Sequence, residues 1–244
     1  MIATRSFALC AAAALSAGAF AGGFFVQTTF ENGLEGWVGP TGGGGSTFIE
    51  PGTGNPGNSL RTVFNNFGIT FVNSDPGFVR DLSSHSSVTF SVDVQVNSIF
   101  FFSQEVSRPW LVEFRDYDNG GSGYPWDSVW FLLTPELSSA AHGDWTTFSV
   151  TFDATQAALP AGWGGYGEED PNTFEPILPA HRTFADIMAT YDQIAITTFQ
   201  PGFFFGFTDH DIRLDNITLS SVPAPGVGAM LLGASGLATL RRRR

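Results

Sequence analysis

Two short segments place aromatic rings beside carboxylates, a combination that suits sugar binding. Tyr124 and Trp126 lie in one segment, and Trp163 and Tyr166 lie in another that continues into the acidic run 168–170. A flat ring can stack on the C–H face of a sugar while carboxylates accept hydrogen bonds from its hydroxyls. We therefore interpret these four aromatic residues as candidate ligand-binding residues. The alternative is core packing, because aromatic residues make up 14% of the chain.

The sequence offers no arrangement typical of catalysis. Four histidines are scattered without the H-x-H or H-E-x-x-H spacing of a metal site: His85, His142, His181 and His210. The single Cys10 lies in an N-terminal segment that we expect to be removed. A G-x-S-x-G elbow and a phosphate-binding glycine loop are both missing. We expect a protein that is not an enzyme, although the many acid pairs leave a polysaccharide hydrolase as a minor alternative.

The charge pattern argues against nucleic acid as a partner. Arg supplies all 11 basic residues, and five of them lie at the ends, at Arg5 and at 241–244. All 23 acidic residues lie between, so the middle of the chain carries 6 Arg against 23 acids, a net charge of −17. Such a surface repels phosphate backbones and anionic lipid. We expect no nucleic-acid partner, and membrane contact only through the C-terminal tail.

Short apolar alternations, separated by Gly, Pro, Asn and Asp, predict one all-β domain over residues 24–221. The longest places its apolar side chains on one face of a strand, namely Val88, Phe90, Val92, Val94 and Val96. Similar segments occur at 110–114, 129–133 and 148–152. A final strand is predicted at 211–220. Its apolar positions change from even-numbered to odd-numbered residues near Asp215, which predicts a β-bulge there.

The remaining segments complete the predicted fold. A capping box at Thr183 and Asp186 predicts one short helix that ends near Thr190. Loops are expected at 42–45 and 159–179. The sum is a single antiparallel β-sandwich of the jelly-roll type with one short helix.

The N-terminus has the pattern of a secretory signal peptide over residues 1–21. Arg5 provides the positive charge, 7–15 the apolar stretch, and Ala19 and Ala21 the small-x-small cleavage site. We therefore expect the protein to be exported.

The C-terminus, residues 222–244, has the pattern of a short anchor. After Pro223 and Pro225 come fifteen small or apolar residues, 226–240, and then four Arg. As a helix the fifteen would span roughly 22 Å, less than a hydrocarbon core of about 30 Å. The Arg cluster would hold such a tail at the cytoplasmic edge of a membrane.

This layout resembles the PEP-CTERM sorting signals of bacterial exported proteins. The resemblance rests on the Pro223 and Pro225 motif, the short apolar stretch and the Arg cluster, and it departs from the family at Ala224, where Glu is usual. It implies an exosortase-type sorting enzyme as a partner. It also implies a cell-surface or extracellular location, with transient or stable anchoring by the tail.

The domain resembles galactose-binding-like modules. The segments 30–31 and 36–37 near the start and 214–219 at the end look like their bracketing strands. Between these, 144–148 and 184–196 are similar in order to laminin-B (domain IV) type modules. The resemblance implies a jelly-roll fold and a binding or matrix role.

Calcium is the cofactor that the acidic residues could hold. In similar sandwiches an ion ties the first strand to the last, and Glu31 and Asp215 occupy those places. An ordinary surface Glu and a bulge-capping Asp are the alternative. The segment from Asp116 to Asp127 imitates an EF-hand loop but lacks its flanking helices, so a polar hairpin loop is the preferred interpretation.

These observations favour a non-catalytic binding module for carbohydrate or another matrix component. A structural protein of the envelope or biofilm matrix, with no specific small ligand, is the main alternative.

Overall fold

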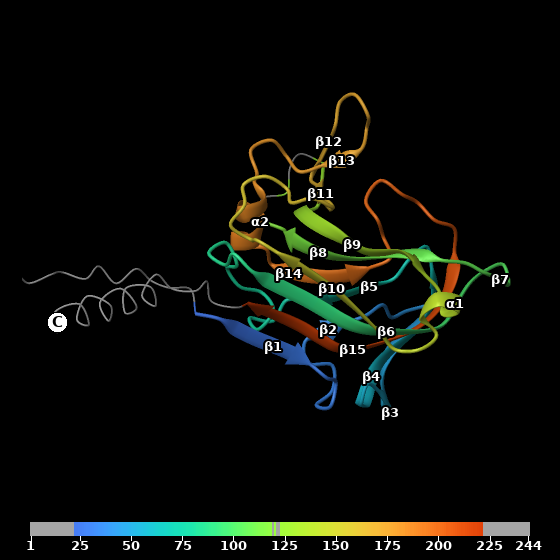
Figure 1. Cartoon of the computed structure of the whole chain (residues 1–244). Helices are drawn as coiled ribbons and strands as arrows, with labels where there is room; N and C mark the ends of the chain where they lie inside the picture. The colour runs from blue at the N-terminus through green and yellow to red at the C-terminus, as the bar shows by residue number, and fades with distance from the viewer. Residues whose placement is uncertain (1–21, 119, 121–122, 222–244) are drawn as a thin grey trace, which may run out of the picture.

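The computed structural model describes residues 22–118, 120 and 123–221 (Figure 1). The predicted signal peptide, 1–21, and the predicted sorting tail with Pro223 and Pro225 lie outside the described residues. Among the residues that are described, no helix is long and apolar enough to cross a membrane.

The first sheet contains seven antiparallel strands in the order β10-β6-β15-β4-β3, with β1 also paired to β15 and β7 to β6. The strands are β1 (Phe24–Thr28), β3 (Gly45–Gly54), β4 (Gly57–Asn66), β6 (Val88–Phe101), β7 (Gln104–Glu105), β10 (Thr146–Phe152) and β15 (Thr208–Ser221). The first and last described strands therefore lie side by side, with Phe24 opposite Ser221.

The second sheet contains six antiparallel strands in the order β11-β9-β8-β14-β5-β2. They are β2 (Trp37–Val38), β5 (Thr70–Asn73), β8 (Arg108–Asp116), β9 (Asp127–Leu137), β11 (Trp163–Tyr166) and β14 (Gln193–Thr197). A small ribbon, β12 (Glu168–Glu169) with β13 (Pro176–Ile177), completes the strands. The chain passes repeatedly between the two layers (Figure 1), so the predicted antiparallel sandwich of the jelly-roll type is confirmed.

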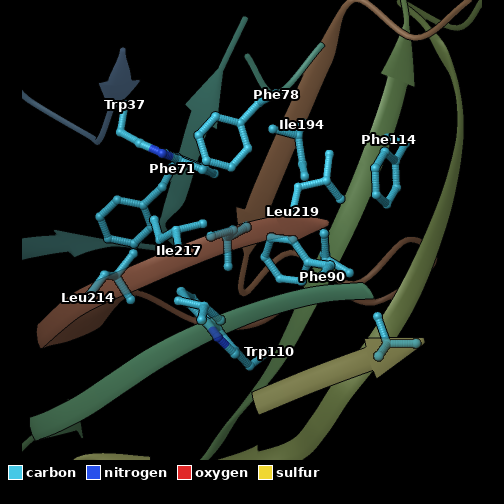
Figure 2. Close-up of a cluster of buried hydrophobic side chains, with 14 of the residues drawn as sticks. Trp37, Phe71, Phe78, Phe90, Trp110, Phe114, Ile194, Leu214, Ile217 and Leu219 are labelled. Carbon is cyan, nitrogen blue, oxygen red and sulfur yellow. The ribbon is translucent and has the colours of Figure 1, made fainter. Parts of the chain in front are cut away.

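The core lies between the two sheets, and the period of two decides which side chains enter it. All five apolar positions predicted for β6 are buried. In β15 the buried apolar residues change from even-numbered to odd-numbered positions between Leu214 and Ile217. Figure 2 shows that both side chains belong to the same buried cluster. Asn216 has a φ of 49°, and the pairing with β6 shifts register between Asp215 and Thr218. The predicted bulge is therefore confirmed, and it keeps both halves of the strand facing the core.

The helix prediction is confirmed in its position and its cap. Helix α2 (Phe184–Thr190) begins after Thr183, whose hydroxyl accepts a hydrogen bond from the Asp186 backbone N–H at 3.1 Å. The Asp186 carboxylate in turn accepts the Thr183 backbone N–H at 2.8 Å, which completes the capping box. A second helix, α1 (Ser139–His142), was not expected.

The expected loop at 159–179 is wrong in part, because it contains β11, β12 and β13. In β11 the side chains alternate, so Trp163 and Tyr166 lie on opposite faces of the sheet. Trp163 is only 9% exposed. Its ring packs against four others, those of Phe114, Phe131, Phe152 and Phe184, with centroids between 4.9 and 6.0 Å away. The prediction that Trp163 binds ligand is therefore corrected: it is a core residue.

We predict that Trp163→Ala lowers the free energy of unfolding by about 3–5 kcal/mol, because it leaves a large cavity among packed rings. Urea denaturation measures the change. As a control, Phe174→Ala removes a ring that is 73% exposed and should leave stability almost unchanged. Similar losses in the two variants would contradict the core assignment.

Candidate functional site

The outer face of the second sheet carries a buried pair of charges. In β8 the alternation turns Val112 and Phe114 toward the core and Glu113 and Arg115 toward the opposite face. Glu113 is nevertheless only 3% exposed and Arg115 only 8%. Other groups must therefore cover this face of the sheet.

Glu113 and Arg115 satisfy each other and fix a neighbouring ring. Arg115 donates to Oε2 of Glu113 through Nε at 2.8 Å and Nη2 at 2.7 Å. The other oxygen, Oε1, accepts from Trp126 Nε1 at 3.0 Å and from Ser128 Oγ at 2.6 Å. The Arg115 guanidinium also lies 4.4 Å from the centre of the Trp126 ring. Trp126 is thus held in one orientation above an electrically balanced floor.

A row of four aromatic rings lies beside this floor, and its two middle rings, Trp126 and Tyr166, form one wall of the site. Trp126 lies 5.4 Å from Tyr117 and 5.7 Å from Tyr166, and Tyr166 lies 5.0 Å from Tyr124, measured between ring centroids. Burial, and then the negative charge of Glu113, raises the pKa of Tyr166. Burial and the nearby Glu169 carboxylate likewise raise the pKa of Tyr124. Both hydroxyls therefore stay protonated near neutral pH and can donate as well as accept hydrogen bonds.

The opposite wall is a tight turn that follows β14. Phe203 donates its backbone N–H to the Gln200 carbonyl at 3.0 Å, and Gly202 has a φ of 82°. Pro and Gly at the two central positions are typical of a type II turn, which requires a positive φ at the second. The turn presents Phe199 and Phe203, which are 41% and 62% exposed.

The floor and the two walls enclose a groove of about 400 Å³. It is lined by Thr70, Glu113, Arg115, Trp126, Tyr166 and the segment 199–203. Its apolar surface comes from aromatic rings and Pro201, and its polar groups are hydroxyls, an amide and the balanced ion pair. Such a groove can stack flat ligands and hydrogen-bond their hydroxyl groups.

Two of the four aromatic residues predicted to bind ligand, Trp126 and Tyr166, line this groove, and a third, Tyr124, packs on Tyr166. Tyr124 and Trp126 precede β9 and Tyr166 ends β11, which pairs with β9. The sequence reasoning missed Glu113 and Arg115. Glu113 occupies an outward position of the predicted strand 110–114 and Arg115 follows that strand directly, so a charged pair two residues apart was the available signal.

The EF-hand-like segment forms a hairpin, as the preferred interpretation held. Asp116 and Asp127 are opposite each other in the β8–β9 pairing and are both buried. Arg182 bonds to Asp116 and lies 3.7 Å from Asp127, measured from Nε to Oδ2. Thr190, at the end of α2, also donates to Asp116. These acids therefore tie the hairpin to the segment around α2.

Glu31 and Asp215, the predicted calcium ligands, both bind the turn between β3 and β4. Glu31 accepts the backbone N–H of Asn58 at 2.7 Å, and Asp215 accepts that of Asn55 at 2.5 Å. Within the described ranges no three His, Cys, Asp or Glu side chains gather closely enough to hold a metal ion. Calcium here stays a prediction, and the contacts give the two carboxylates a different role, which is to hold the turn.

A scan against protein-family models found no match, and a search of the curated proteins found no relative. Three solved structures illustrate the structural matches.

The family 11 carbohydrate-binding module from Clostridium thermocellum, in complex with a β-1,3-1,4-mixed-linked tetrasaccharide, is 14% identical, with a TM-score of 0.46 over 82% of this chain and 96% of that one. The CBM22-1 and GH10 modules of endo-1,4-β-D-xylanase 10B from Clostridium thermocellum, complexed with xylohexaose, are 12% identical, with a TM-score of 0.46. That match covers 80% of this chain but only 28% of the xylanase chain. A non-crystalline cellulose specific module, CBM28, is 15% identical, with a TM-score of 0.35 over 78% of this chain and 90% of that one.

Asp215 gives this end of the sandwich a pH dependence. Burial, together with the negative charges of Asp93 and Glu31, raises its pKa from an ordinary 3.8 to about 6. The folded state therefore holds this proton more tightly than the unfolded state. The contribution of Asp215 to the free energy of unfolding is fully present below pH 4, and it falls by about 2–3 kcal/mol as the pH rises to 6. We predict that Asp215→Asn removes this fall, as measured by denaturation at several pH values in EDTA.

A metal at the same place would act in the opposite direction. If calcium binds Asp215, it favours the ionised carboxylate, and adding calcium at pH 7 should raise the melting temperature of the wild type but not of Asp215→Asn. Identical wild-type melting in calcium and in EDTA would remove calcium from the description. An equally steep pH profile in the variant would show that another group titrates.

Proposed function

We propose that this protein is a non-catalytic binding module for carbohydrate, and that the groove on the outer face of the second sheet is its site. The observation that carries the proposal is the pair of opposed aromatic walls above a fully hydrogen-bonded polar floor. Rings on both sides suit a ligand with apolar C–H faces. The polar groups between them suit a ligand rich in hydroxyls.

The groove is held in its shape before any ligand arrives. Gln193 accepts hydrogen bonds through Oε1 from the Tyr117 hydroxyl at 2.9 Å and from Arg115 at 3.3 Å. Thr70 shares a hydrogen bond of 2.7 Å with Thr197 on the neighbouring strand. Side chains fixed in this way lose little freedom on binding, which favours affinity for a weakly contacting ligand such as a sugar.

The chemistry of the groove supports binding rather than hydrolysis. Glu113 is the sole acidic residue among the residues lining the groove, and both of its oxygens accept hydrogen bonds. A glycosidase needs two carboxylates that flank the bond to be cut. The described residues that line the groove include one carboxylate, that of Glu113, and both of its oxygens already accept hydrogen bonds.

A second candidate function, a structural role in a surface matrix, is favoured by a different observation. The loop before β15 exposes Phe204 and Phe207, at 79% and 51%, and both pack on Phe67 outside the groove. An exposed apolar cluster of this kind suits contact with another protein. Self-association in analytical ultracentrifugation, in the absence of any glycan, would favour this function.

We propose further that the chain is exported and sorted through its ends. The described domain begins at β1 and ends at β15, and these two strands pair. A leader at 1–21 and a sorting tail at 222–244 would therefore join the domain at one place. The tail would be processed at the Pro223 and Pro225 motif by an exosortase-type enzyme, leaving the module at the cell surface or outside the cell.

This export proposal predicts the mass of the mature protein. The protein purified from its native producer should begin at Gly22 and should lack the Arg cluster of residues 241–244. Replacing Pro223 and Pro225 by Ala should leave the tail attached, as intact-mass spectrometry would show. A mature protein that retains residues 1–21 would contradict export by this leader.

The groove proposal predicts that Trp126→Ala weakens binding to a neutral polysaccharide by about tenfold or more, because it removes the central ring of one wall. The measurement is affinity electrophoresis of the wild type and the variant against mixed-linkage β-glucan, xylan, galactomannan and agarose. Trp126→Phe keeps a ring but loses the hydrogen bond to Glu113, so an intermediate affinity is expected.

The matched control is Phe102→Ala. Phe102 is 85% exposed and lies in the turn between β6 and β7, on the other sheet. Its loss should leave both folding and binding unchanged. The proposed function would be overturned if the wild type and Trp126→Ala bound the polymers equally, or if the wild type bound none of them.

A further inference from the structure

A second cavity of about 380 Å³ lies beside the groove. It is lined by Trp130, by the residues 173–176 and by the same turn, 200–203, that forms one wall of the groove. The turn therefore has a cavity on each side. We call the first the Trp126 chamber and the second the Trp130 chamber.

Trp130 is fixed in a position where its ring can receive a ligand. It lies on β9, and its ring rests on the backbone of Gly164 in β11, where an added Cβ would stand 2.2 Å from Cζ2 of the ring. Its Nε1 donates to the Gly165 carbonyl at 3.3 Å. Only glycine at position 164 permits this contact, so one ring face is supported by the strand while the ring lines the chamber.

The rim of the Trp130 chamber presents a second ring at a conformational cost. Phe174 is 73% exposed and has a φ of 59°, which is rare for a bulky residue. The loop that carries it is held by Asp170, whose side chain accepts the backbone N–H groups of Asn172 and Thr173. Phe174 lines the chamber and most of its ring is exposed, so the ring surface is available to a ligand there.

The turn links the two chambers into one surface. At Gly202 an added Cβ would lie 3.0 Å from Cδ of Pro176 in β13, so the tip of the turn meets the β12–β13 ribbon. Gln200, Pro201, Gly202 and Phe203 line both chambers. A single sugar ring would occupy one chamber and leave the other rings uncovered.

The charges of the two chambers identify the class of ligand. Arg115 is already bonded to Glu113, and the lining of the Trp130 chamber contributes Glu175. Glu168 and Glu169, both exposed, lie in the adjoining ribbon. Within the described residues no free cation lines either chamber: the charges of Glu113 and Arg115 balance in the Trp126 chamber, whereas the Trp130 chamber and its adjoining ribbon carry only carboxylates. Uronic acids and sulfated sugars would be repelled.

We infer that the Trp130 chamber is a second sugar subsite, so that the ligand is a linear, uncharged glycan whose chain extends across the turn at 200–203 and occupies both chambers. The inference rests on the proposed function, which requires only the Trp126 chamber. It adds Trp130 and Phe174 as ligand-binding residues, and it assigns the turn the role of dividing the site.

The test compares short and long ligands in isothermal titration calorimetry. The probes are the disaccharides and hexasaccharides cut from mixed-linkage β-glucan, xylan, galactomannan and agarose, with alginate and dextran sulfate as charged polymers. The wild type should bind one of the hexasaccharides about tenfold or more tightly than its disaccharide, because only the longer chain reaches both chambers.

The variants separate the two chambers. Trp130→Ala and Phe174→Ala should bring the affinity for the hexasaccharide down toward that of the disaccharide, whereas Trp126→Ala should weaken both. Phe174 is exposed, so its variant keeps the test valid even if Trp130→Ala disturbs the contact with Gly164. Phe102→Ala serves again as the control.

Each outcome has a distinct meaning. Equal affinity for the short and long chains, or unchanged hexasaccharide binding in both Trp130→Ala and Phe174→Ala, would overturn the second subsite and leave the proposed function standing. Tight binding of alginate or dextran sulfate would overturn the uncharged class. If the wild type bound none of the probes, both the proposed function and the second subsite would be overturned.

Discussion

The ion pair between Glu113 and Arg115 is the interaction on which the rest of the groove depends. Both charges are buried on the outer face of a sheet, where each alone would be strongly destabilising. Their geometry balances the charge, and the remaining carboxylate oxygen orients Trp126 and Ser128. The pair thereby turns the outer face of β8 into a floor that supports rings.

Burial on both faces also explains why β8 looks different from the strands of the other sheet. Every residue from Arg108 to Asp116 is buried. In β6 and β10, by contrast, the outward residues reach solvent or are half-buried in most positions. The outward side chains Glu113 and Arg115 are covered because Trp126 and Ser128 bond to Glu113 and the Trp126 ring lies against Arg115. On the first sheet α1 packs against β6, but the outward side chains of β10 stay exposed or half-buried.

The sequence allowed most of the sandwich to be predicted, because local patterns control local structure. Alternation identified β6, β8 and β10, a capping box identified α2, and a change of parity identified the bulge at Asp215. Prediction failed at β11, which lies in the segment 159–179 that was expected to be a loop. Once that segment is a strand, the period of two places one aromatic residue in the core and the other in the groove.

The composition of the site could be predicted only in part, since its members come from distant segments. Thr70, Glu113, Tyr166 and Phe199 meet because of the strand order, and strand order is not written in any short stretch of sequence. Aromatic type indicated Tyr124, Trp126 and Tyr166. Nothing local distinguished Trp130, whose availability depends on a glycine in the neighbouring strand.

The position of β15 in the middle of its sheet has a mechanical consequence. This strand is bonded to β6 on one side, and on the other side to β4 over Thr208–Leu214 and to β1 over Ile217–Ser221. A tether pulling on Ser221 would act along the strand and load the hydrogen bonds of two ladders together. Many bonds would then have to break at once instead of one after another. A module anchored by its C-terminal end would thus resist unfolding when force is applied through its bound ligand.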